Sequence, residues 1–165
     1  MEWGMDGEAN AFLEEVLLWL SENLPLNPNP KKLCWGDSRL GNILFENFQV
    51  KSLLDWEMAT IGDPLCDLAW GLTTDDVSSY GLNIEKLPGS ISNEEAIKFW
   101  EKNTGYSAEN FFYYRILCLF KFSVIMIRVA KKVIHNEIMP LDSDFHVNNH
   151  VSNYLRQEFN EKNNN

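Results

Sequence analysis

Apolar residues recur every three to four positions in several stretches of the chain, which is the periodicity of an amphipathic helix. Between Glu8 and Asn23 this spacing predicts a helix, and the prolines of the following PLNPNP end it. Asp63 and Pro64 have the order of an N-cap and a first helical residue. Further helices are expected over residues 64–72, 93–103, 107–135 and 143–159.

Short apolar runs lie between the first two helices. NILF and VKSLLDW, separated by ENFQ, have the spacing of a β-hairpin, and KKLCW before them predicts a short strand or an extended segment. The polar stretch CWGDSRLGN, residues 34–42, is therefore a loop that leads into the hairpin. Residues 73–90 are expected to form a loop or a short helix.

The composition fits one globular domain over residues 1–159. Of the 165 residues, 45% are apolar and 13% are aromatic, which is enough for a sizeable core. The predicted elements give an α+β fold that is mainly α-helical. The last six residues, NEKNNN, are polar and lack apolar periodicity, so residues 160–165 are expected to be a disordered tail.

Charge and cysteine content exclude several classes of partner. The net charge is -10 and Lys and Arg do not cluster beyond KK pairs, so no nucleic acid partner is expected. The most apolar segment, residues 111–130, contains Arg115, Lys121 and Arg128 and predicts a buried helix, with no membrane partner. Three cysteines without a CxxC motif, and an acidic N-terminus unlike a signal peptide, favour a cytoplasmic protein.

The polar loop carries side chains suited to phosphoryl transfer. In protein kinases an Asp accepts the proton of the attacking hydroxyl, an Asn five positions later binds magnesium, and a further Asp binds magnesium again. Asp37, Asn42 and Asp55 have this order. Carboxylate and amide oxygens are ligands for a hard cation, and Arg39 adds a positive group that can bind phosphate oxygens.

The longer stretch from Trp35 to Trp70, WGDSRLGNILFENFQVKSLLDWEMATIGDPLCDLAW, resembles the catalytic core of the aminoglycoside phosphotransferase-like kinases. Their usual pattern is HGDxxxxN, a hairpin, then (I/L)DW or (I/L)DxE, and GDPxxDLA. The stretch is most similar to the subgroup that also occurs fused to acyl-CoA dehydrogenases. The resemblance implies the C-terminal lobe of a protein-kinase-like fold with a small β-hairpin beside the catalytic loop, Mg²⁺, ATP as co-substrate, and a small-molecule hydroxyl as acceptor.

The resemblance also implies roles for individual residues in catalysis. Asp37 is the expected catalytic base, and Arg39 is expected to lie near the transferred phosphate. Asn42 and Asp55 are the expected magnesium ligands. Glu57 is either a further carboxylate on the metal side or a solvated loop charge.

Other residues near the loop are expected to support it. Asp67 is expected to brace the loop backbone from the following helix, and Trp35 stands where the family usually has a supporting histidine. Asp75 and Asp76 are interpreted as solvated loop charges, with attraction of a cationic substrate as the less favoured alternative. Trp70 and the tryptophans outside the loop are expected to fill the core or cover its edges.

The chain departs from a complete kinase in what precedes Asp37. Only 36 residues lie before it, whereas a kinase of this type has there a β-rich lobe with a nucleotide-covering loop, a strand lysine and a helix glutamate. We therefore expect the N-terminal ATP lobe to be absent. The favoured hypothesis is the catalytic C-terminal lobe of a small-molecule kinase, which a separate N-terminal lobe or a homo-oligomer could complement. The alternatives are a non-catalytic remnant that binds a partner chain and, less favoured, a metal-dependent hydrolase.

Overall fold

The computed structural model describes residues 10–163 of the chain. These residues divide into two compact units, one formed by residues 25–115 and the other by residues 10–24 together with 116–163. Helix α5, Phe111–His135, contributes its first residues to one unit and the rest to the other. In the part of the chain that the structure describes, no helix is both long and apolar enough to cross a bilayer.

The unit formed by the two ends of the chain is helical. It contains α2 (Ala11–Glu22), most of α5 and α6 (His150–Asn163). The ring of Phe159 on α6 contacts Phe12 and Trp19 of α2 edge to face, at centroid distances of 6.1 and 5.8 Å. Aromatic contacts of this geometry stabilise a packed interface beyond the area that they bury.

In this helical unit the N-terminal helix agrees with the sequence predictions, and the C-terminal helix differs from them. The helix expected over residues 8–23 is confirmed as α2, with residues 8 and 9 outside the described part. The helix expected from residue 143 begins instead at His150, because the Asn149 side chain accepts hydrogen bonds from the backbone N–H groups of Val151 and Ser152 and caps it there. The helix then continues to Asn163 and includes residues 160–163 of the tail predicted to be disordered; residues 164 and 165 lie outside the described part.

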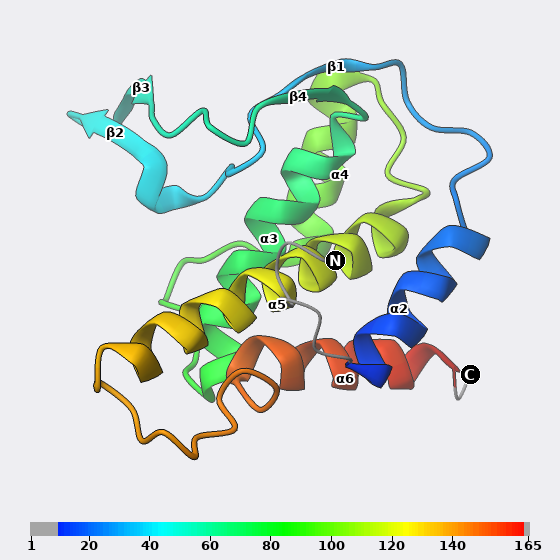
Figure 1. Cartoon of the computed structure of the whole chain (residues 1–165). Helices are drawn as coiled ribbons and strands as arrows, with labels where there is room; N and C mark the ends of the chain where they lie inside the picture. Colours follow the sequence, from blue (N-terminus) through cyan, green and yellow to red (C-terminus); the bar gives the residue numbers. More distant parts are fainter. Residues whose placement is uncertain (1–9, 164–165) are drawn as a thin grey trace. The chain divides into compact units, whose positions relative to one another are not determined.

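The other unit contains all of the β-structure of residues 10–163, as two small antiparallel pairs (Figure 1). The hairpin predicted from the sequence is confirmed as β2 (Ile43–Glu46) and β3 (Gln49–Leu53). The strand expected before the polar loop is confirmed as β1 (Lys32–Cys34), and it pairs with β4 (Thr60–Gly62), which the sequence did not indicate. The hairpin is thus inserted between two strands that pair with each other, and this pairing fixes both ends of the insertion.

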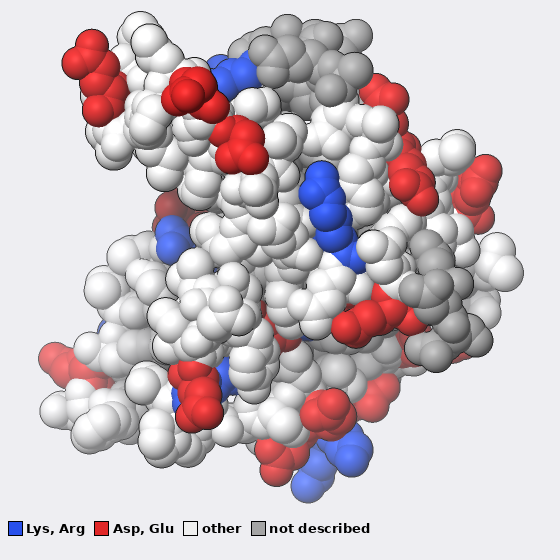
Figure 2. All heavy atoms as spheres, turned by 90° about the horizontal axis from the view of Figure 1, so that it is seen from below, with Lys and Arg blue, Asp and Glu red and all other residues white. Residues whose placement is uncertain are grey.

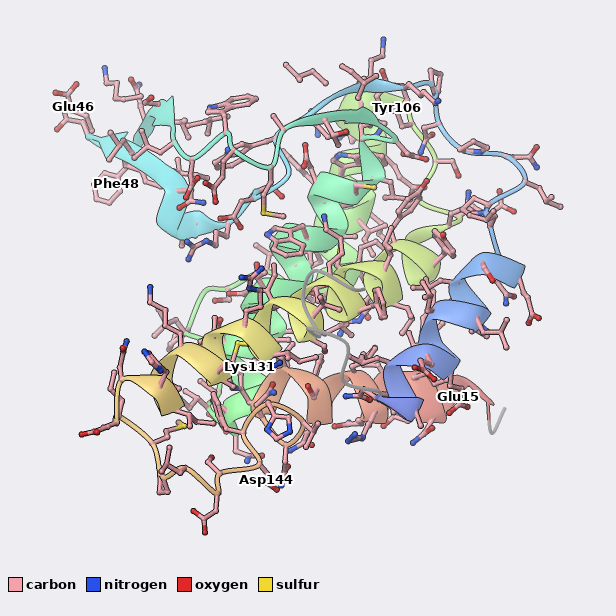
Figure 3. The ribbon with its side chains drawn as sticks, viewed as in Figure 1. Glu15, Glu46, Phe48, Tyr106, Lys131 and Asp144 are labelled. Carbon is pink, nitrogen blue, oxygen red and sulfur yellow. The ribbon has the colours of Figure 1, made fainter. Side chains whose placement is uncertain are left out.

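The hairpin presents exposed apolar side chains. Its register pairs Ile43 with Leu53 and Phe45 with Val50, so the members of each pair share a face, and the register shifts between Leu44 and Phe45. Phe45 and Val50 are about half exposed, at 50% and 56%. The ring of Phe48 lies fully exposed at the tip (Figure 3). A two-stranded hairpin with an uncovered apolar face is marginally stable in water, so this face is suited to packing against further structure.

Helix α3 (Leu65–Ser79) follows the second β-pair, and Asp63 holds its start in place. The buried Asp63 carboxylate accepts hydrogen bonds from the backbone N–H of Leu65 at 2.9 Å, from the N–H of Asn29 at 2.8 Å and from the Tyr114 hydroxyl at 3.2 Å. The Asp63 side chain thus accepts a backbone N–H at the start of α3, as predicted, but the helix begins at Leu65, so Pro64 precedes it and is not its first residue. The Asp63 side chain also joins three segments of this unit that are distant in sequence.

Helix α3 is longer than the sequence predicted. It continues to Ser79, so the expected end near Leu72 and the expected solvation of Asp76 are wrong, whereas Asp75 is exposed as expected. The reason is that Asp76 is buried, with 1% exposure, and forms an ion pair at 2.7 Å with Arg115. The sequence pattern predicted a solvated charge at Asp76, but the structure buries this residue on a helix beside Arg115. The partner lies far along the chain, so the local pattern did not indicate the burial.

The remaining helices of the two units agree with the sequence predictions in type. The short 3-10 helix η2 (Tyr80–Leu82) and an extended segment connect α3 to α4 (Asn93–Thr104), which Ser92 and Glu95 cap reciprocally. Helix α5 begins at Phe111, four residues after the start of the helix predicted over residues 107–135. On the molecular face drawn in Figure 2, acidic side chains are spread out and not gathered in one patch.

Candidate active site

The polar loop of residues 35–42 lies between β1 and the hairpin, and two close backbone approaches hold it. Gly36 has a φ of +91°, and a Cβ atom there would lie 2.2 Å from the carbonyl oxygen of Met58. Gly71 on α3 is similarly close to the loop, because a Cβ atom there would lie 2.7 Å from the carbonyl oxygen of Ser38. Only glycine fits these two positions without displacing the backbone. The loop is thus in contact with both the segment after the hairpin and helix α3.

One face of α3 supports the loop. Asp67, Trp70 and Gly71 are spaced i, i+3 and i+4, so they lie on the same side of the helix. The Asp67 carboxylate accepts hydrogen bonds from the backbone N–H groups of Trp35 at 2.7 Å and Gly36 at 2.8 Å. The Ser38 hydroxyl donates to the carbonyl oxygen of Asp67 at 2.6 Å. This carboxylate therefore binds two consecutive peptide groups whose N–H bonds are not part of a helix.

Three side chains hold the Asp37 carboxylate. The indole N–H of Trp70 donates to its Oδ1 atom at 2.7 Å, and its Oδ2 atom accepts from the side-chain amide of Asn42 at 2.7 Å and from Nε of Arg39 at 3.0 Å. The Asp37 side chain is 13% exposed. Because Oδ1 accepts one bond and has a second lone pair, it can accept a hydrogen bond from an incoming hydroxyl.

These contacts determine the charge state of Asp37. Burial of the carboxylate raises its pKa, but the hydrogen bonds from Trp70, Arg39 and Asn42 favour the ionised form and together lower the pKa below its ordinary value. Asp37 is therefore a carboxylate at neutral pH. A carboxylate in this state can orient a hydroxyl and accept its proton as the hydroxyl oxygen reacts.

The hairpin carries the two residues expected to bind a metal ion. Asn42, 7% exposed, precedes β2 directly, and Asp55 follows β3. The backbone N–H of Leu54 donates to the carbonyl oxygen of Asn42 at 2.8 Å, so the ladder brings the ends of the hairpin together next to these two residues. The Asn42 amide nitrogen is bonded to Asp37, which leaves its side-chain oxygen as the atom suited to a cation. Asp55 has a φ of +59° and is exposed.

The two remaining candidates differ in their surroundings. Glu57 is exposed, and no group of three or more His, Cys, Asp or Glu side chains among residues 10–163 is arranged to hold a metal ion. Asp37, Asp55 and Glu57 thus do not form a three-carboxylate centre. Trp35 is buried, and its indole N–H donates to the carbonyl oxygen of Leu54 at 2.7 Å, which joins the loop to the end of the hairpin.

The sequence analysis missed the contact of Trp70 with Asp37. Trp70 was interpreted as a core residue, and it is indeed buried, with 4% exposure, but its indole also donates to the candidate base. The helical spacing from Asp67 to Trp70 was a signal that both residues face the loop. No comparable signal was available for Asp76, whose partners Arg115 and Lys86 are distant in sequence or in a different element.

A hollow of about 460 Å³ lies beside the loop. The loop, helix α3 and the segment leading into α4 form its walls. Its lining residues are Ser38, Arg39, Leu40, Gly41, Gly71, Leu72, Thr74, Asp75, Ser78, Ser90, Ile91 and Ala96. The guanidinium of Arg39, about half exposed, is thus available both to Asp37 and to a molecule in the hollow.

The amino-acid sequence is similar to one known family and to several known proteins. Residues 2–99 match the sequence profile of the phosphotransferase enzyme family. A protein named acyl-CoA dehydrogenase family member 11 from Pongo abelii is 35% identical over 124 residues, covering 68% of this chain and 16% of the relative. The Homo sapiens protein of the same name is 48% identical over 59 residues, covering 34% of this chain and 8% of the relative.

The fold is similar to that of a solved structure. A crystal structure of a protein from Ralstonia eutropha JMP134, assigned as an aminoglycoside phosphotransferase, superposes with a TM-score of 0.69 at 18% identity. The match covers 95% of this chain and 49% of that one. The chain therefore spans about half of the solved structure and about one sixth of the Pongo abelii relative.

The indole of Trp70 should keep the pKa of Asp37 low. Trp70→Phe removes the donor and keeps a buried ring, so the pKa of Asp37 should rise, because burial then opposes fewer hydrogen bonds. A carboxylate whose pKa is lowered on folding stabilises the fold above its unfolded pKa of about 3.9, and this stabilisation is lost as the pH falls through the folded pKa. In the variant this stabilisation should therefore be smaller, and its loss should be complete at a higher pH.

Carbon-13 NMR titration of the Asp37 carboxyl group measures this change. Trp56→Phe is the matched control, because the Trp56 indole donates to the carbonyl of Leu53 and not to Asp37. An unchanged or lower Asp37 pKa in Trp70→Phe would contradict the assignment.

The carboxylate of Asp67 should contribute to stability through the loop backbone. Asp67→Asn should lower the free energy of unfolding by about 1–3 kcal/mol, because an amide nitrogen cannot accept the N–H of Trp35 or Gly36. Asp37→Asn should cost less, since it retains an oxygen acceptor for Trp70 and since Arg39 can reach water. Urea denaturation of both variants measures the difference, and a larger loss for Asp37→Asn would refute the supporting role.

Proposed function

The chain belongs to the phosphotransferase enzyme family, and we propose that it supplies the acceptor-activating and metal-binding side of an ATP-dependent small-molecule kinase. The observation that carries this proposal is the Asp37 carboxylate, held ionised by Trp70, Arg39 and Asn42. The residues that follow it, Ser38 and Arg39, line a hollow. Such a carboxylate can orient a hydroxyl without competing for a proton at neutral pH. The acceptor is then a hydroxyl-bearing molecule that fits the hollow of about 460 Å³.

In the proposed reaction the acceptor hydroxyl donates a hydrogen bond to Asp37. Its oxygen attacks the γ-phosphorus of ATP in line with the bond to the leaving ADP oxygen; the new O–P bond forms as that bond breaks. The hydroxyl proton passes to Asp37 and then to solvent. Arg39 binds an oxygen of the transferred phosphoryl group and offsets its charge, while its Nε remains paired with Asp37.

The residues beside Asp37 fit a magnesium ion in their chemistry. The side-chain oxygen of Asn42 and the carboxylate of Asp55 are hard oxygen donors at the two ends of the hairpin, and Glu57 is a further exposed carboxylate nearby in sequence. When bound with the nucleotide, magnesium supplies positive charge to the phosphate oxygens. An ion bound to the Asn42 oxygen would also fix the orientation of the Asn42 amide, whose nitrogen donates a hydrogen bond to Asp37 at 2.7 Å.

The nucleotide side of the proposed site comes from further structure. Kinases cover the ATP phosphates with a glycine-rich loop and a strand lysine, and the Ralstonia eutropha structure has about as much chain again as the part that matches here. We propose that a β-rich lobe, in the same polypeptide or another, packs near the hairpin. The exposed apolar face of Phe45 and Val50 supports this proposal. The same face supports the second candidate function, a partner-binding protein without activity of its own.

The proposed compartment is the cytoplasm. Cys34 and Cys118 are buried, which suits thiols kept in a reducing environment.

Asn42 and Asp55 should bind a divalent cation weakly in the absence of nucleotide, because water then replaces the phosphate ligands. Mn²⁺ should broaden the NMR signals of the Asn42 side-chain amide and of the Leu54 and Asp55 backbone. The double substitution Asn42→Ala, Asp55→Ala should abolish the broadening of the backbone signals, and Glu46→Gln, which removes an exposed carboxylate from the same hairpin, should leave it unchanged. Broadening that survives the double substitution would refute the metal site.

Phosphate transfer should require the complementary lobe and Asp37. ADP release is measured with Mg²⁺-ATP and a panel of hydroxylated acceptors, using the chain alone and the chain joined to the nucleotide-binding lobe of a relative. Acceptor-dependent turnover should appear only in the joined protein, and Asp37→Asn should lower it by about 10²-fold or more. Turnover that is insensitive to Asp37→Asn would refute the catalytic role, and robust turnover by the chain alone would refute the need for a second lobe.

A further inference from the structure

The segment of residues 83–92, between η2 and α4, is held weakly by its own backbone and by packing. Its backbone hydrogen bonds are local, such as the N–H of Ile84 to the carbonyl of Ser79 at 2.9 Å and the N–H of Ser90 to the carbonyl of Leu87 at 3.0 Å. Ile84, Leu87 and Ile91 are 57%, 80% and 51% exposed. These apolar side chains therefore contribute little burial that would fix the segment to the rest of its unit.

Lys86 provides the strongest attachment of this segment. Its ammonium lies 2.7 Å from a carboxylate oxygen of Asp75 and 2.6 Å from one of Asp76, and 5.5 Å from the ring centre of Tyr80. The Lys86 side chain is only 13% exposed. Within the described part of the chain, no other side chain of residues 83–91 forms a hydrogen bond or ion pair with another element. We call the group of Lys86, Asp75 and Asp76 the Lys86 latch.

The two carboxylates of the latch differ in how they are held. Asp76 is buried, and its other oxygen accepts hydrogen bonds from Arg115 and from the side-chain amide of Asn93, both at 2.7 Å. Asp75 is 61% exposed. If Lys86 leaves, Asp76 still has Arg115 as a buried counter-charge, and Asp75 is solvated. Opening the latch therefore leaves the Asp76 charge paired with Arg115, which avoids the usual cause of a large penalty when an ion pair is broken, although the Oδ1 atom of Asp76 loses its contact with Lys86.

The same segment forms a shared wall between two hollows. Ser90 and Ile91 line the hollow of about 460 Å³ beside Arg39, and they also line a second hollow of about 670 Å³ that contains Lys86 and Asp76. Asp75 belongs both to the latch and to the lining of the first hollow. A molecule in the first hollow that donates a hydrogen bond to Asp75 would therefore compete with Lys86.

We propose that residues 83–92 form a lid over the hollow beside the 35–42 loop, and that the Lys86 latch holds this lid closed. Movement of the lid merges or separates the two hollows and so changes the space next to Arg39. Binding of a donor group to Asp75 weakens the latch from inside the hollow, which couples occupation of the hollow to the position of the lid. This device does not depend on the chemistry that the loop performs.

Amide hydrogen exchange on the full chain tests the latch. Lys86→Met keeps most of the side-chain length and removes the charge, so amides of residues 83–92 should exchange about tenfold faster or more, while those of α3 and α4 keep their rates. Lys86→Arg should stay within about threefold of the unsubstituted chain, because a guanidinium can pair with both carboxylates. Lys51→Met is the matched control, since it removes an exposed ion pair with Glu46 in the same unit and should not affect residues 83–92.

A second variant keeps the test decisive if Lys86→Met does not fold. Asp75→Asn removes only the exposed carboxylate, leaves Asp76 paired with Arg115, and should accelerate exchange in residues 83–92 by a smaller factor than Lys86→Met. Unchanged exchange in residues 83–92 in both variants would overturn the latch. Acceleration of equal size throughout α3 and α4 would show that Lys86 stabilises the whole unit, and would overturn the lid.

Discussion

The bond between the Asp67 carboxylate and two consecutive peptide groups is the constraint on which the candidate site depends. The N–H groups of Trp35 and Gly36 follow β1 at the point where the chain leaves its strand, and Gly36 has a positive φ that removes it from regular structure. A charged acceptor at hydrogen-bond distance from both groups satisfies them together. Because Asp67 lies in the first turn of α3, the position of this helix determines where the loop begins and, through it, where Asp37 lies.

At Asp37, burial of the carboxylate and the hydrogen bonds to it have opposite effects on its pKa. Burial alone would raise the pKa of this carboxyl group, and the three hydrogen-bond donors reverse the direction. Two of these donors, Arg39 and Asn42, come from the loop itself, and the third, Trp70, comes from the helix that also supports the loop. The electrostatic environment of the candidate base therefore depends on the same contact between loop and helix as its position does.

The sequence predicted those parts of the fold that depend on local patterns. The hairpin and helices α2 and α4 follow from apolar periodicity and caps, and the order of Asp37, Asn42, Asp55 and Asp67 indicated the family. The sequence-based prediction was wrong where the structure of a segment depends on a partner that is distant in sequence. Asp76 is helical and buried because of Arg115, and β4 exists because β1 pairs with it. The late start of α6 follows from one capping side chain, Asn149, in a region where the apolar pattern alone allowed an earlier start.

Helix α3 holds both the 35–42 loop and the proposed lid, but by contacts of different kinds. This difference indicates which of the two segments is easier to displace. Toward the loop it presents Asp67, which accepts two partly buried backbone hydrogen bonds, and Gly71, which the loop backbone approaches closely, so displacement would leave peptide groups unpaired. Toward the lid it presents Asp75 and Asp76, which hold a flexible lysine side chain. Since Arg115 remains with Asp76 when Lys86 departs, opening the second attachment costs less than opening the first. The contacts that position the candidate base are thus stronger than those that hold the proposed lid.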